Sequence, residues 1–198
     1  MALMLGTIVA VSISVYKSVG GSMKGTIRLE TERLVLRRFE AGDAGVLYRE
    51  FGANGKMSRY SGWNPYATPE MAANTVREYL ESYDDQPFYS WAIEQDGELV
   101  GTIGAYDFDA GQNSIEIGLS IVESCWGKGY ASEALVAALC HLVGTEGIAL
   151  IKGWCASDNV GSRRVMEKCG MTLSNTEKGA LVVGDETFDR LDFVYRRQ

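Results

Sequence analysis

The sequence predicts a single mixed α/β domain with a mostly antiparallel central sheet of six to seven strands, flanked by about four helices. Two alternating apolar runs between residues 87 and 107 meet at Asp96-Gly97, a dipeptide typical of a tight hairpin. A strand pattern over residues 114–121 leads through a glycine turn into a helical pattern that ends near residue 143. The apolar run at 148–155 follows that helix, so the fourth and fifth strands should pair in parallel.

Composition bounds the architecture and the class of partner. The chain has 198 residues, 46% of them hydrophobic, and only 3 prolines, which suits one core without an interdomain linker. A formal net charge of −7 argues against a nucleic acid or an anionic membrane as partner and favours a cationic one such as an amine. The cysteines are widely spaced and there is one histidine, so no metal site or disulfide framework is indicated. Reduced thiols and a cytoplasmic location are expected.

Residues 1–26 are expected to be an N-terminal extension, and residues 27–198 the folded domain. The first 22 residues are apolar but too short to span a bilayer, and no basic residue lies near their start, which disfavours a secretory signal. The alternation over residues 9–15 fits a strand better. Gly20-Gly21-Ser22 resembles a joint ahead of Met23, which is an alternative start of the chain.

The first part of the domain predicts one strand and two helices. Residues 27–39 alternate in the manner of a strand with one polar face. Asp43 can cap a helix that runs to about Phe51. After a loop, Thr68-Pro69-Glu70 supplies an N-cap, a first-turn proline and an early acid for a second helix that ends near Tyr83.

The last part of the domain predicts one further helix between strands. The segment 158–162 can cap a helix over residues 163–169, which Gly170 terminates. The chain then returns as a strand from Met171, and a final strand covers residues 188–195.

The glycine turn after the fourth strand has the properties of an anion site. The first turn of a helix has unpaired N–H groups and the positive end of the helix dipole, and glycine lets a phosphate approach the backbone. A Walker loop would need Gly-Lys-Ser/Thr, and a dinucleotide fingerprint would need a third glycine where Ser132 stands. Neither motif is present, and a phosphate is expected at residues 127–132.

The same stretch resembles the acetyl-CoA pyrophosphate loop of the GNAT superfamily of N-acetyltransferases. The family pattern is Arg/Gln-x-x-Gly-x-Gly/Ala, and this chain has Trp126-x-x-Gly129-x-Ala131. Trp at the first position is similar to the branch that includes the ribosomal-protein N-terminal acetyltransferases. ETERLVLR at 30–37 and ASDNVGSRRVMEKCGM at 156–171 resemble two further family segments, so the resemblance covers about residues 27–197.

The resemblance implies that acetyl-CoA is the co-substrate and that the fourth and fifth strands splay apart around it. Carried onto this chain, the cofactor contacts fall on the end of the fourth strand, on the glycine turn and on the cap of the next helix: Ile121, Val122, Trp126, Gly127, Lys128, Gly129, Ala131, Ser132 and Asn159. Lys128 would act only as an electrostatic helper. Asn159 has an equally good structural interpretation as an N-cap.

Acetyl transfer to an amine requires a base, a stabilised oxyanion and a proton for the leaving thiolate. Glu116 is the candidate base, because it lies among apolar residues on the central strand. The alternative is that Glu116 is a solvated or hydrogen-bonded structural acid. Backbone amides of residues 119–121 would stabilise the oxyanion. Ser162, directly or through a water, would supply the proton.

Other candidate side chains lie outside the two motifs. Trp63 and Tyr60 belong to an aromatic loop that the resemblance places on the acceptor side, and the alternative is that they pack this loop onto the core. The isolated His141 is expected to be solvated or packed and not catalytic, which argues against Ser-His-Asp or Cys-His chemistry.

The expected function is acetyl-CoA-dependent transfer to a primary amine, directly within a ternary complex. The amine would be a protein N-terminus or a small molecule such as a polyamine or an antibiotic. An acyl-CoA-binding regulatory or sensor module without turnover is the alternative, and a non-enzymatic interaction protein is a third. Neither nucleic acid nor membrane is expected as a partner, and a homodimer is left open.

Overall fold

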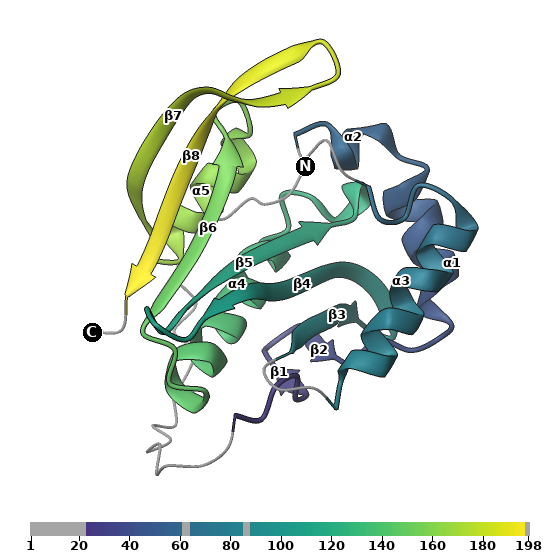
Figure 1. The fold of residues 1–198 in the computed structure, drawn as a ribbon. Coiled ribbons are helices and arrows are strands. Elements are labelled where there is room, and N and C mark those ends of the chain that lie inside the picture. The colour runs from purple at the N-terminus through teal and green to yellow at the C-terminus, as the bar shows by residue number, and fades with distance from the viewer. Residues whose placement is uncertain (1–22, 61–63, 85–87, 197–198) are drawn as a thin grey trace.

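One eight-stranded sheet organises the fold, in the order β1-β2-β3-β4-β5-β6-β8-β7 (Figure 1). The computed structural model describes residues 23–60, 64–84 and 88–196. The strands are β1 (Leu29–Glu30), β2 (Val35–Arg37), β3 (Tyr89–Gln95), β4 (Glu98–Asp109), β5 (Ser114–Ile121), β6 (Leu150–Ala156), β7 (Thr172–Val183) and β8 (Glu186–Arg196). The helices are α1 (Asp43–Leu47), α2 (Gly55–Ser58), α3 (Pro69–Ser82), α4 (Tyr130–Cys140) and α5 (Val160–Lys168).

The predicted fold class is confirmed, including the parallel pair, which is β5 with β6. The other neighbouring strands pair antiparallel. The strand count differs from the prediction partly because residues 27–39 form two short strands and not one. Thr31 makes the turn between them, since its N–H donates to the Leu34 carbonyl at 2.9 Å and its Oγ1 accepts from the Leu34 N–H at 2.9 Å.

Two groups of helices cover the sheet. α4 and α5 lie behind it in Figure 1, whereas α1 and α3 gather at its other side beside β3 and β4. Small buried residues of α4, Ala134 and Ala138, alternate with the larger Leu135 and Leu139, so this helix packs closely against β4 and β5. Within the described ranges, no helix combines the length and the apolar character needed to cross a membrane.

Side chains at the helix starts show which capping predictions hold. Thr68 Oγ1 accepts from the Met71 N–H at 3.1 Å, which confirms the predicted start of α3. Asp43 does not cap α1, which begins after Gly42. Its carboxylate instead binds the Arg37 guanidinium at 2.8 Å and the Glu40 N–H at 2.8 Å. Asp43 is thus the first residue of α1, and its carboxylate turns back toward Arg37 and does not cap the helix.

Residues just before the predicted domain boundary at 27 are part of the packed structure. Thr26 is 1% exposed, and its Oγ1 donates to the Phe88 carbonyl at 3.0 Å and accepts from the Ser90 N–H at 2.9 Å. The Gly25 carbonyl accepts from Nε2 of His141 at 2.9 Å. His141 is therefore packed and not solvated, and burial lowers its pKa. The predicted strand at 9–15 lies outside the described residues.

Removing the Thr26 hydroxyl should destabilise the fold. In Thr26→Val the shape is kept, but the Ser90 N–H and the Phe88 carbonyl lose a buried partner, so we expect the free energy of unfolding to fall by about 1–3 kcal/mol. Urea denaturation followed by fluorescence measures the change. Thr187→Val, at an exposed position of β8, is the matched control. Equal stability of the two variants would show that the Thr26 contacts contribute nothing.

Candidate active site

The site begins where β5 and β6 stop pairing. Their register runs through Ser114↔Leu150, Ile115↔Ile151 and Glu116↔Lys152 and then ends. Beyond that point β5 stays paired with β4, and β6 with β8, so the two strands are drawn to opposite sides (Figure 1). This divergence is the splay that the sequence predicts for the fourth and fifth strands.

The free edge of β5 is offered by Leu119 and Ile121. The Val122 N–H donates to the Val100 carbonyl on β4 at 2.9 Å, and the Val122 carbonyl accepts from the Cys125 N–H at 2.9 Å. Since backbone groups alternate in direction along a strand, those of Leu119 and Ile121 point the other way, into the gap. The Ile121 carbonyl already accepts from Nε1 of Trp126 at 2.8 Å. Val122 therefore does not belong to this free edge, contrary to the expectation. Trp126 holds the end of β5 through its bond to the Ile121 carbonyl.

The glycine turn has the backbone shape that an anion requires. Gly127 and Gly129 have φ angles of 77° and 85°, in the left-handed region, and Gly129 is the N-cap of α4. In the first turn of α4, Ala131 and Ser132 are buried, and among the described atoms the Ser132 Oγ finds no hydrogen-bond partner. Lys128 Nζ is turned toward Cys125 Sγ at 3.8 Å. The two glycines with positive φ and the amides at the start of α4 suit a pyrophosphate.

Arg33, which lies just before β2, holds this turn in place. Its Nε donates to Glu133 Oε2 at 2.7 Å, and its Nη1 donates to the Lys128 carbonyl at 2.9 Å. The guanidinium lies 4.9 Å from the centre of the Tyr130 ring. Glu133 is 6% exposed and also accepts from Thr31 Oγ1 at 2.6 Å. Sequence patterns do not reveal this contact, because an arginine before a strand and a glutamate in a helix are both common.

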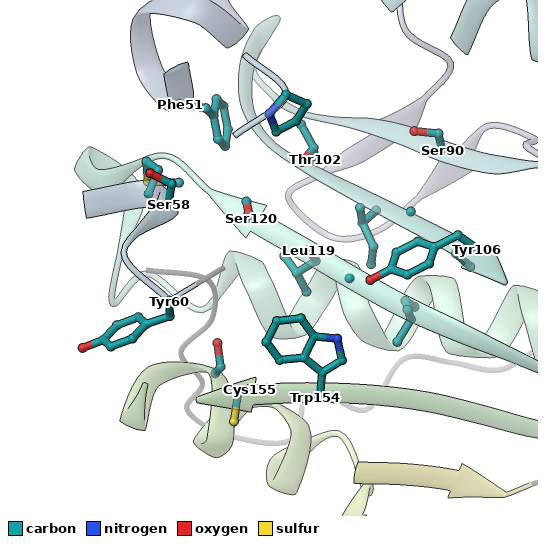
Figure 2. Close-up of a pocket in the computed structure, with 18 of the residues that line it drawn as sticks. Phe51, Ser58, Tyr60, Ser90, Thr102, Tyr106, Leu119, Ser120, Trp154 and Cys155 are labelled. Carbon is teal, nitrogen blue, oxygen red and sulfur yellow. The ribbon is translucent and has the colours of Figure 1, made fainter. Parts of the chain in front are cut away.

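A cavity of about 770 Å³ extends from the gap over the sheet. Figure 2 shows Thr102 and Ser120 on its sheet side, Phe51 and Ser58 to the left of them, and Trp154 rising from β6 on the opposite side. Tyr60 lines the cavity and packs edge-on against Phe188 on β8, with ring centroids 5.3 Å apart, which is compatible with either interpretation of this residue. Trp63 lies outside the described residues.

Asn159 and Ser162 lie on the cofactor side of the same cavity. They are 4% and 2% exposed, and both line it. Asn159 Oδ1 accepts from the Ser162 N–H at 3.1 Å, as an N-cap of α5 does. The structural interpretation of Asn159 is therefore correct, and its place in the cavity wall keeps the cofactor role open as well.

Glu116 is held by aromatic side chains at the closed end of the gap. Its Oε1 accepts from Nε1 of Trp154 at 2.9 Å, and its Oε2 lies 3.8 Å from the Arg190 guanidinium. That guanidinium stacks over the Trp154 ring at 4.8 Å. The Glu116 side chain is 20% exposed. Glu116 is thus a hydrogen-bonded acid, and Trp154, which the sequence analysis did not select, connects it to the cavity.

Tyr106 is a further residue that sequence reasoning missed. It lies opposite Glu116 in the pairing of β4 with β5, and it lines the cavity. Its hydroxyl crosses over Gly118, where an added Cβ would meet Tyr106 Oη at 3.0 Å. Tyr106 is 46% exposed overall, but the protein around its hydroxyl, the negative charge of Glu116 and a hydrogen bond to that carboxylate all raise its pKa. Its phenol is therefore protonated at neutral pH. The register of β4 and β5 shifts by one between Tyr106 and Asp109, so counting back from the turn would have placed Asp107, and not Tyr106, opposite Glu116.

Comparison with known proteins gives the family. The family model described as "Acetyltransferase (GNAT) domain" matches residues 33–172. The uncharacterized N-acetyltransferase YoaA of Bacillus subtilis is 30% identical over 144 residues, which cover 72% of this chain and 81% of the relative. The uncharacterized N-acetyltransferase p20 of Bacillus licheniformis is 26% identical over 84% of this chain and 92% of its own length.

Solved structures share the fold over nearly their whole length. A GNAT-family acetyltransferase from Bacillus anthracis superposes with a TM-score of 0.74 at 27% identity, covering 86% of this chain and 98% of the other. RimL, a ribosomal L7/L12 alpha-N-protein acetyltransferase solved with coenzyme A, has a TM-score of 0.79 over 86% of this chain and 98% of its own, and at 19% identity this likeness concerns the fold alone. Together with the splayed strands and the glycine turn, the family match shows that the chain belongs to the GNAT acetyltransferases and that acetyl-CoA is its co-substrate.

Proposed function

We propose that the chain transfers the acetyl group to a primary amine, of a protein N-terminus or a small molecule, while both substrates are bound together. One observation carries this proposal. The cavity is continuous from the gap, at Leu119 and Asn159, to the space over β4, at Thr102 and Tyr66. Because both ends open into one space, direct transfer needs no acyl group stored on the protein.

Co-substrate binding is assigned to the glycine turn and the edge of β5. The amides of residues 127–132 and the Ser132 hydroxyl would hold the pyrophosphate, and Arg33 keeps this turn in place from outside. Leu119 and Ile121 would pair with the extended arm of acetyl-CoA as an added strand does. Most of the proposed contacts to the cofactor are therefore made by backbone groups. Asn159 lines the cavity on the side away from β5 and would contribute a side chain.

Glu116 is the proposed general base, acting with Tyr106. The hydroxyl of Tyr106 can accept a proton from the bound ammonium group while it donates its own to the carboxylate, so a proton reaches Glu116 before the neutral nitrogen attacks. Backbone N–H groups of β5 at the gap would stabilise the negative charge that develops on the thioester oxygen. Ser162 is the proposed donor of the proton that the departing sulfur takes up, because it lines the cavity on the cofactor side.

Replacing Gly129 should weaken acetyl-CoA binding far more than it weakens the fold. In Gly129→Val the left-handed φ of 85° becomes strained, and the new side chain meets the Arg33 guanidinium. We expect the Kd of acetyl-CoA, measured by calorimetry, to rise at least about tenfold. Gly184→Val, with a φ of 59° in the distant β7–β8 turn, carries similar backbone strain and should bind normally. Unchanged affinity in folded Gly129→Val would place the pyrophosphate elsewhere.

Removing the charge of Glu116 should slow the chemical step. Glu116→Gln keeps an oxygen for the Trp154 indole but cannot accept a proton, so we expect kcat at neutral pH to fall by about 10²–10⁴ with acetyl-CoA affinity little changed. The defect should shrink at high pH, where the amine arrives deprotonated. A pH–rate profile of CoA release measures both effects, with Glu177→Gln on β7 as the control. Full activity at every pH would make Glu116 purely structural.

A further inference from the structure

The acceptor half of the cavity, called the chamber here, has aromatic walls. We define the chamber by the lining residues Phe51, Tyr66, Tyr79, Ser90, Thr102 and Tyr106. Phe51 and Tyr66 pack edge-on at 6.0 Å, which fixes the wall away from the gap. Aromatic surfaces of this kind favour an apolar or aromatic body in a ligand.

The polar groups of the chamber are neutral and already linked to one another. Tyr66 shares hydrogen bonds with Thr102 and with Tyr79, and Tyr79 shares one with Ser90. Burial raises the pKa of both tyrosines, so they remain uncharged phenols. Thr102 lies opposite Ser120 in the pairing of β4 with β5, which carries the line of hydroxyls to the edge of the gap. Such a row can exchange hydrogen bonds with a ligand but offers it no charge.

Charged side chains are nearly absent from the walls. Among the described residues that line the cavity, Asp107 alone is charged. Charged neighbours just outside are neutralised within the protein, as Arg59 is by Glu186 at 3.1 Å and Arg190 by Asp192 at 2.7 Å. Away from Asp107, which follows Tyr106 near the end of β4, a second ammonium group or a phosphate placed in the chamber would lose its hydration without gaining an opposite charge, which is costly.

We propose that the acceptor is a monoamine whose body is uncharged and largely apolar or aromatic, with neutral hydrogen-bonding groups at most. This inference rests on the proposed function and narrows it. It rejects polyamines, aminoglycosides and phosphorylated amines, although the net charge of −7 would draw cations toward the protein. The net charge attracts cations from a distance, whereas the walls of the chamber determine which amine fits. The fit inside the chamber decides which amine reacts.

An amine panel tests the inference. The kcat/KM of CoA release is compared for 2-phenylethylamine, an uncharged peptide with an N-terminal phenylalanine, spermidine and kanamycin. We expect one or both phenyl-bearing amines to exceed the two polycations at least about tenfold, and the better of them identifies a small molecule or a protein N-terminus as the source. A higher kcat/KM for spermidine or kanamycin would overturn the inference but leave the proposed function intact.

A charge-matched pair of variants tests the same point within the chamber. Thr102→Asp places a carboxylate on the row of hydroxyls, and Thr102→Asn places an uncharged group of the same shape there. We expect the ratio of kcat/KM for spermidine to that for 2-phenylethylamine to rise about tenfold or more in the first variant and to stay within about twofold in the second. An equal response of both variants would mean that charge in the chamber does not select the acceptor.

Calorimetric titration of the amines in the presence of CoA separates the two proposals. If no amine releases CoA but 2-phenylethylamine still binds more tightly than spermidine, the proposed function fails and the chemistry inferred for the chamber stands. If no amine reacts and none binds, both proposals fail. Circular dichroism of the Thr102 variants confirms that they are folded before either comparison is made.

Discussion

The early end of the parallel pairing between β5 and β6 is the constraint on which the site depends. Three residue pairs join these strands, and each strand then follows its antiparallel partner, β4 or β8. Backbone groups inside a sheet are normally satisfied by the next strand, so an interrupted pair exposes an edge within the core. Here the edge is Leu119 and Ile121, and an extended ligand arm can complete it. The fold thus holds a place for one more strand.

The chemistry proposed for the site collects at the closed end of that gap. Glu116 is the last residue of β5 that pairs with β6, so its side chain lies where the two strands begin to separate. Trp154 from one strand and Tyr106 from another reach it from both sides. Gly118 keeps the space over which the Tyr106 hydroxyl passes. Fold and chemistry are connected here, because the geometry that opens the gap also sets the position of the carboxylate.

Local sequence patterns predicted the helices and strands well. They could not predict contacts between residues on different strands of the sheet. The start of α3 at Thr68 and the turn into α4 depend on a few consecutive residues, which the sequence displays. The Arg33 contact with Glu133 joins positions separated by 100 residues. Trp154 and Tyr106 likewise meet Glu116 only once register is known. The Val122 expectation failed for a related reason, since alternation along β5 decides which carbonyls face the gap.

The Arg33 brace makes the beginning of the domain part of the cofactor site. Through Glu133 and the Lys128 carbonyl, the bend between β1 and β2 and the glycine turn hold one another in place. The bend and the glycine turn are thermodynamically linked. A ligand that makes one of them rigid reduces the conformational entropy that the other loses when it becomes ordered. Acetyl-CoA seated on the turn would therefore also slow the opening of residues 31–34. The short β1–β2 hairpin, too small to be stable alone, would share in the binding energy of the ligand through these contacts.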